Sequence, residues 1–152
     1  MKINIYQIVK KSDDKFEPIV QEFVKMIQKW AKVEIHNMFN KQISKAQTIG
    51  QKESQVAYND VFIPKLSFGY NIALDVLGKN IDSFQFSKLL ENKTTINFFI
   101  GGAYGFNKDF LNRCDSIISL SSLTFAHKIA NIILCEQIFR GLAIKNNHPY
   151  HK

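Results

Sequence analysis

The sequence predicts an α/β fold, with a mainly parallel sheet and flanking helices in a single domain over residues 1–152. Short apolar runs suited to strands alternate with stretches whose apolar residues recur at helical spacing, as in such folds. One apolar run, Ile96–Ile100, leads directly into the glycine-rich turn Gly101–Phe106. In open α/β sheets such a turn lies at the carboxyl end of a buried strand, where ligands bind. The length is that of one domain, and no repeat or low-complexity tract divides the sequence.

The composition is that of an ordinary globular protein, apart from its charge. Hydrophobic residues make up 45% of the chain and charged residues 22%, which excludes a disordered or fibrous protein. The net charge of +7 favours contact with phosphate backbones or acidic membranes, although many basic proteins bind neither. The sequence has no apolar run near the ~18 residues of a membrane span and no signal-peptide layout. We therefore expect a cytoplasmic protein without a membrane partner.

The cysteines and histidines show no metal-binding pattern. Cys114 and Cys135 lack ligand spacing and lie in apolar helical patterns, which predicts buried free thiols in a reducing compartment. The histidines are His36, His127, His148 and His151. No two of them have helical metal spacing and no carboxylate cluster accompanies them, so no metal site is expected. His127 is expected to be structural or to line a pocket.

The first half of the chain is predicted to hold two strands and two helices. They are, in order, a strand over Lys2–Val9, a helix from Pro18 through Ala31 that Asp13 or Asp14 caps, a strand over Val33–Phe39, a long loop over Asn40–Lys52 and a helix over Glu53–Leu66, which Pro64 could end or bend early. β-branched residues favour the strands, and apolar residues at helical spacing favour the helices. The loop prediction rests on a polar, lysine-bearing composition that Gly50 interrupts. Such a loop would be functional or a solvated connector.

The second half is predicted to contain three more strands, each followed by a helix. They are, in order, a strand over Tyr70–Asp75 with a turn over Val76–Asn80, a helix from the cap Ser83 to Leu90, a strand over Ile96–Ile100, a short helix over Asn107–Arg113, a strand over Ser116–Leu120 and a helix over Ala126–Ala143. The last helix is apolar on nearly all sides, more than packing on one sheet requires. This favours a symmetric dimer, with burial under loops of the same chain as the alternative. The polar tail Lys145–Lys152 has the composition of a disordered end.

Two turns of the predicted sheet are candidates for a ligand site. The turn Gly101–Phe106 follows one strand and the hydroxyl-rich run Ser121–His127 follows the next, so both could face one pocket. The glycines resemble a dinucleotide fingerprint, but that fingerprint belongs to the first βα unit, with an acidic residue ~20 positions later. An oxidoreductase is therefore disfavoured, and a tight turn without a ligand is the alternative for a single loop. Ser121 and Ser122 lie in no strand–turn–helix elbow for a nucleophile.

Glu136 and Arg140 are four residues apart on the polar side of the last predicted helix. Such a pair usually forms a surface salt bridge worth roughly 0.3–0.5 kcal/mol. If the surrounding apolar residues form a dimer interface, Arg140 instead becomes a candidate for reaching RNA or the partner chain.

Four segments of the sequence together resemble one known family. They are Leu74–Asp75, Phe99–Gly105, Ser119–His127 and Asn147–Lys152. In combination they are similar to the RlmH family, the bacterial ribosomal RNA large subunit methyltransferases of the SPOUT class, and the resemblance covers essentially the whole chain. It implies an α/β fold with a carboxyl-terminal trefoil knot, and a homodimer that binds S-adenosylmethionine in the knotted cleft. It also implies methylation of N3 of a pseudouridine in 23S rRNA.

The resemblance further implies which residues bind the cofactor. The matching positions are Leu74, Gly102, Ser121, Ser122, Leu123, Thr124, Phe125 and Ala126. The chain departs from the family pattern at Ala103 and Tyr104, where the family usually has proline and glutamate, and at Ala126, where it usually has proline. Contacts made by the backbone should survive these departures.

The tail supplies a hypothesis for the substrate side of the reaction. The proton on N3 must leave, so a base or a stabiliser of the anion is needed. His151, with Tyr150 and His148, would serve the RNA base, and Arg140 would hold phosphate or the developing anion, in its own chain or across a dimer. The lysines expected to contact phosphate are Lys41, Lys45, Lys52 and Lys152. The rival hypotheses are a non-catalytic RNA- or ribosome-binding dimer of the same fold and a nucleotide-dependent oxidoreductase.

Overall fold

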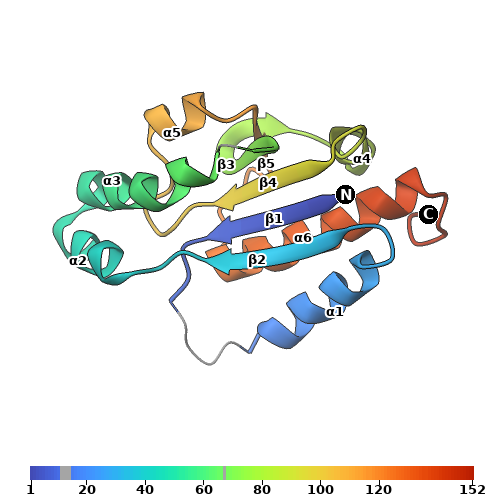
Figure 1. The fold of residues 1–152 in the computed structure, drawn as a ribbon, viewed down its shortest axis with the longest axis horizontal. Coiled ribbons are helices and arrows are strands. Elements are labelled where there is room, and N and C mark those ends of the chain that lie inside the picture. The colour runs from blue at the N-terminus through green and yellow to red at the C-terminus, as the bar shows by residue number, and fades with distance from the viewer. Residues whose placement is uncertain (11–14, 67) are drawn as a thin grey trace.

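The computed structural model describes residues 1–10, 15–66 and 68–152, and its centre is a parallel sheet of five strands (Figure 1). The strands are β1 (Lys2–Gln7), β2 (Lys32–Asn37), β3 (Tyr70–Asn80), β4 (Thr95–Ile100) and β5 (Ser116–Ser119). They lie in the order β2-β1-β4-β3-β5, and every pair is parallel. This confirms the predicted α/β fold with a parallel sheet and helices on its faces. The trefoil knot that the resemblance implies stays a prediction at this point.

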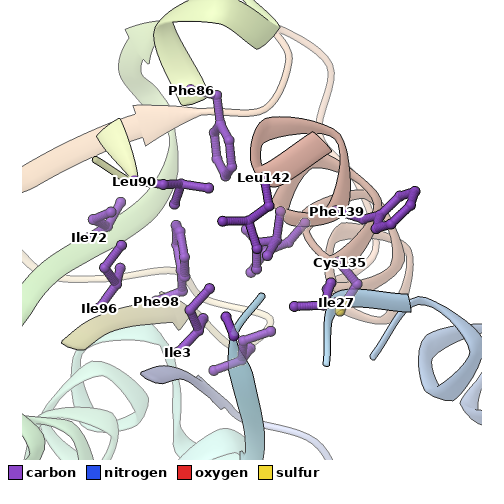
Figure 2. Close-up of a cluster of buried hydrophobic side chains, with 14 of the residues drawn as sticks. Ile3, Ile27, Ile72, Phe86, Leu90, Ile96, Phe98, Cys135, Phe139 and Leu142 are labelled. Carbon is purple, nitrogen blue, oxygen red and sulfur yellow. The ribbon is translucent and has the colours of Figure 1, made fainter. Parts of the chain in front are cut away.

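The first face of the sheet is covered by three helices, α1 (Glu17–Ile27), α4 (Ser83–Leu89) and α6 (His127–Lys145). Alternate residues of the strands, such as Ile3, Ile96 and Phe98, point to this face, as the two-residue period of a strand requires. Figure 2 shows these side chains in one cluster with Leu142 and Cys135 of α6. Helix α6 packs between α1 and α4. The strands are thus buried as a parallel sheet needs to be.

The second face is covered by α2 (Lys41–Ile49), α3 (Gln51–Phe62) and α5 (Lys108–Asn112). The prediction of a long loop over Asn40–Lys52 is therefore wrong. The Asn40 side chain caps α2 by accepting the Ile43 N–H at 2.8 Å, and Gly50 separates α2 from α3. The buried side of α2 consists of only Ile43 and Ala46, which is too few apolar residues to give a visible helical period.

Strand β3 runs further than predicted, because the segment Val76–Asn80 continues it instead of forming a turn. The register against β5 shifts between Leu74 and Lys79, as in a β-bulge. A Cβ atom on Gly78 would lie 2.7 Å from the Ile118 backbone, so β3 and β5 approach here as closely as a glycine allows.

Several predicted boundaries move by a few residues. Helix α1 ends at Ile27 instead of Ala31, and the proposed caps Asp13 and Asp14 lie outside the described residues. The cap of α4 is Asp82, which forms a capping box with Gln85, and not Ser83. Helix α3 ends at Phe62 and is followed by a 3₁₀ turn, η1 (Ile63–Lys65), that contains Pro64. Among the described helices, none combines the length and apolar character needed to cross a membrane.

Candidate functional site

The carboxyl ends of β4 and β5, together with the middle of β3, surround a cavity of about 470 Å³. Its walls come from three segments. The first is Leu74–Val76 in the middle of β3, the second is the glycine turn Gly101–Phe106, of which only Tyr104 does not line the cavity, and the third consists of residues between Ser119 and Ala130 that lead into α6. The two turns singled out in the sequence therefore face one pocket, at the place where open α/β sheets bind ligands.

Most of the predicted cofactor-binding residues line this pocket. They are Leu74, Gly102, Ser121, Leu123, Thr124, Phe125 and Ala126. The described lining residues do not include Ser122, whose side chain is exposed to solvent. His127 lines the pocket, as expected. Asp75 is the one acidic residue among the described lining residues; it was missed as a site residue, although it ends a predicted strand.

The shape of the glycine turn depends on the absence of side chains at two positions. A Cβ atom on Gly102 would lie 2.5 Å from the Tyr58 hydroxyl and 2.6 Å from the ring carbon that bears it. Gly105 has a φ angle of +64°, in the left-handed region that favours glycine. Its N–H donates to the Gly102 carbonyl at 3.0 Å and closes the turn. Backbone at this edge of the pocket can therefore approach a ligand closely.

The hydroxyl-rich turn is held by its own serines. The Ser119 hydroxyl donates to the Ser121 carbonyl at 2.7 Å, and the Leu123 N–H donates to the Ser121 hydroxyl at 3.0 Å. These hydroxyls thus fix the turn, as serine side chains commonly do in loops. The turn ends at Ala126, the N-cap of α6, so the positive end of the helix dipole lies at the pocket.

The predicted substrate-side residues form a separate cluster near the other end of α6. Arg140 donates through Nε and Nη2 to Glu136 Oε1, and its Nη1 lies 3.2 Å from His151 Nδ1. The Tyr150 hydroxyl donates to the same Glu136 oxygen at 3.1 Å. The structure thus brings His151, Tyr150 and Arg140 together, and we call these residues with Glu136 the tail cluster. The tail is folded against its own chain instead of being a disordered end, because His151 packs on Phe84.

His148 lies apart from the tail cluster. Its ring packs edge-on against Trp30 and Phe139, with centroids 5.5 and 6.1 Å away. The backbone N–H of His148 donates to the Ala143 carbonyl at 2.9 Å, and this bond turns the chain after α6. His148 is thus placed to hold the tail.

The contact with Arg140 selects one tautomer of the neutral His151 ring. Arginine is only a donor, so the Nη1 contact requires a bare Nδ1 on His151, and the proton of the neutral ring is then on Nε2. The hydrogen bonds to Glu136 raise the pKa of Arg140 above its usual value. Burial, followed by the hydrogen bond to Glu136, raises the pKa of Tyr150. The cluster therefore offers hydrogen-bond donors, with a fixed cation among them.

The pocket and the tail cluster are far apart within one chain. The described residues that line the pocket include none of His148, Tyr150, His151 or Arg140. From Ala130, which lines the pocket, to Arg140 the helix rises about 15 Å at 1.5 Å per residue. Figure 1 shows the carboxyl terminus beside α4, beyond the amino ends of the strands. The two groups of predicted residues therefore do not meet in one subunit.

The described residues contain no group of three or more histidine, cysteine, aspartate or glutamate side chains that could hold a metal ion. Both cysteines are free thiols, with Cys135 buried and Cys114 half-buried. Burial raises the pKa of each thiol to about 12, so neither is a reactive thiolate at neutral pH.

Comparison with known proteins gives the family of the chain. The family described as "Predicted SPOUT methyltransferase" matches residues 1–151. A protein named ribosomal RNA large subunit methyltransferase H from Aliarcobacter butzleri is 64% identical over 152 residues, covering 100% of both chains. A protein of the same name from Nitratiruptor sp. is 51% identical and covers 99% of each chain. Another from Sulfurovum sp. is 46% identical and covers 100% of each chain. The chain therefore belongs to the SPOUT methyltransferases, in the group of the ribosomal RNA large subunit methyltransferases H.

Proposed function

We propose that this chain transfers a methyl group from S-adenosylmethionine to N3 of a pseudouridine in 23S rRNA, with residues 1–152 acting as one methyltransferase domain. The observation that carries the proposal is the closure of two backbone turns on one pocket, at the positions that the family resemblance assigns to the cofactor. The names of relatives up to 64% identical over the whole chain support the ribosomal RNA substrate. A cytoplasmic location follows from that substrate.

The chemistry of the pocket fits this cofactor. Its volume of about 470 Å³ lies within the roughly 300–1,000 Å³ that small-molecule sites occupy. Leu74, Leu123 and Phe125 give apolar walls for an adenine ring, and the glycine turn presents peptide groups to its polar edge. Asp75 complements the positive charges of the cofactor, and the amino end of α6 complements its carboxylate. The binding residues that we propose are Leu74, Gly102, Ser121, Ser122, Leu123, Thr124, Phe125 and Ala126.

The cofactor supplies an activated methyl group, so the task of the protein is to align donor and acceptor. The pocket holds the donor, and we assign the acceptor base to the tail cluster. With Nδ1 bonded to Arg140, His151 presents its Nε2–H and acts as a donor to the base after its N3 proton has left to solvent water, rather than as the acceptor of that proton. Arg140 adds a positive charge that does not titrate near neutral pH. Tyr150 packs against the Arg140 guanidinium at 4.8 Å and fixes its plane.

The separation of pocket and tail cluster requires a second subunit. In a two-fold symmetric dimer with the α6 helices side by side and antiparallel, the tail of each subunit approaches the partner's pocket. Exposed apolar side chains beside the pocket suit this interface. Leu123 lines the pocket and is 71% exposed, and Leu77, which follows the lining residue Val76, is 92% exposed. Ile132 and Ile133 on α6 are only half-buried and extend this surface. We therefore propose a homodimer with active sites shared between subunits.

Lysines on the α2–α3 layer are proposed to hold the RNA backbone. Lys41 and Lys45 of α2 and Lys52 of α3 are exposed, as is Lys152 at the end of the tail. Each phosphate that these side chains neutralise would make RNA binding weaker as the salt concentration rises.

The test is methyl transfer from labelled S-adenosylmethionine to ribosomes and to free 23S rRNA, followed by mapping of the modified nucleoside. The proposal predicts one labelled pseudouridine, methylated on N3. A calorimetric titration with S-adenosylmethionine accompanies it. The proposal predicts binding of the cofactor, which a non-catalytic RNA-binding dimer of the same fold would not need. Binding of NAD in place of S-adenosylmethionine, or label on another nucleoside, would refute the proposal.

A further inference from the structure

Helix α3 reaches the glycine turn through the side chain of Gln55. Its amide nitrogen Nε2 donates to the carbonyl oxygens of Tyr104 at 2.9 Å and Phe106 at 3.2 Å. These two carbonyls lie on either side of Gly105, the residue with the positive φ angle. A single amide group on a rigid helix therefore holds both sides of the most flexible position in the turn.

The same helix contacts the turn at a second place. The Tyr58 ring, one helical turn along from Gln55, lies directly beneath Gly102. The Tyr58 hydroxyl accepts the Gln47 side-chain amide at 2.8 Å, and the Gln47 carbonyl oxygen lies 3.5 Å from the Tyr104 hydroxyl. Tyr58 is almost completely buried, so it gives the turn a fixed floor, while Gln55 holds its rim.

Gln55 is not among the described residues that line the pocket, so its effect on a bound ligand must pass through the turn. The turn has little regular structure of its own, and glycine-rich backbone loses much conformational freedom when a ligand orders it. A turn that is already held before binding avoids that loss.

We propose that Gln55 is a positioning residue of the cofactor pocket, which holds the glycine turn in the shape that binds S-adenosylmethionine without touching the cofactor. This inference rests on the proposed function, because it takes S-adenosylmethionine as the ligand. It assigns a role in cofactor affinity to the middle of α3, although Gln55 is 46 to 51 residues away from the turn in the sequence.

The test variant is Gln55→Glu, which keeps the size of the side chain and its helix propensity but removes both amide donors when ionised. The dissociation constant for S-adenosylmethionine, measured by calorimetry, should rise about tenfold, as expected for the loss of one to two hydrogen bonds. The KM for the cofactor should rise in parallel, with kcat at saturation nearly unchanged. Without any cofactor, amide hydrogen exchange at residues 102–106 should become faster.

The matched control is Gln51→Glu, which makes the same chemical change at an exposed position in the first turn of the same helix. It should leave cofactor affinity and hydrogen exchange in the turn at wild-type values. Gln55→Lys, which restores an N–H donor on a flexible stem, should recover most of the affinity.

The inference is wrong if Gln55→Glu binds S-adenosylmethionine as tightly as the wild type, or if Gln51→Glu weakens binding as much. It is also wrong if Gln55→Lys binds no better than Gln55→Glu. If the wild type fails to bind S-adenosylmethionine, the proposed function falls, and faster exchange in Gln55→Glu alone would still support Gln55 as the residue that holds the turn.

Discussion

The two ends of α6 are built in opposite ways. At its amino end, the pocket is made of backbone turns and apolar walls, with Asp75 as the one acidic residue among the described lining residues. At its carboxyl end, the tail cluster consists of polar side chains bonded to one another around Glu136. A preformed backbone pocket suits the holding of a cofactor, while charge-assisted side-chain bonds suit a substrate that gains negative charge. One helix thus separates the proposed donor and acceptor halves of the transfer reaction by about 15 Å.

Removal of the imidazole at the tail end should have the largest effect. His151→Ala is expected to lower kcat by about 10²–10³, the usual loss when a donor to a developing anion is deleted. The dissociation constant for S-adenosylmethionine should stay within twofold of the wild type, because His151 does not line the pocket of its own chain and is assigned to the RNA base instead of the cofactor. Single-turnover methylation of ribosomes measures the first quantity and calorimetry the second. Unchanged turnover would remove His151 from the mechanism.

Addition of a methyl group at Gly102, at the pocket end of α6, should weaken cofactor binding instead of lowering kcat. Gly102→Ala places a Cβ atom against Tyr58, which is almost fully buried and has no room to move away. We expect at least tenfold weaker binding of S-adenosylmethionine and a loss of about 1–3 kcal/mol in the free energy of unfolding, as for other overpacked sites. Titration calorimetry and denaturant unfolding measure these effects.

Gly50→Ala is the control for the pocket variant, because Gly50 has extended backbone and its Cβ position meets only the Glu53 carboxylate, at 3.4 Å. Normal cofactor affinity in Gly102→Ala would show that the glycine turn does not shape the binding site.

The smallest predicted effect is a pH dependence confined to the tail end. The pKa of Tyr150 is raised by burial and then by Glu136, so folding favours the neutral phenol. The contribution of Tyr150 to tail docking is therefore fully present below pH 10 and is lost as the pH rises through its folded pKa. Ultraviolet titration should show a tyrosine ionising above pH 10 that is absent in Tyr150→Phe. A Tyr150 that ionises below pH 10 would mean that the phenol is not held by Glu136.

The sequence was sufficient to predict the parallel sheet and the pairing of two turns at one pocket. Apolar runs such as Ile96–Ile100 carry that information locally, and the turns that follow them must meet at one edge of a parallel sheet. Helix α2 was missed because its buried side consists of only Ile43 and Ala46. The extension of β3 was missed because its pairing with β5 involves a bulge, which no local pattern encodes.

Side-chain contacts between distant segments were beyond sequence reasoning. The bonds from Gln55 to the glycine turn join a helix to a loop that no periodicity connects. The folded tail was hidden for the same reason, because its polar composition resembles a disordered end until Phe84, Phe139 and Glu136 are brought beside it. The hypothesis for the substrate side grouped His148 with His151 and Tyr150, but in the structure His148 packs on Trp30 instead of joining the tail cluster.

The most direct test of a shared active site mixes two defective subunits, Gly102→Ala and His151→Ala, in equal amounts under conditions that allow dimers to exchange. The assay uses a cofactor concentration too low to saturate Gly102→Ala. If pocket and tail act across the dimer, each mixed dimer contains one site with both parts intact, and random exchange should restore about a quarter of wild-type methylation. If pocket and tail act within one chain, every site keeps a defect, and methylation would not rise above the average of the two variants measured separately.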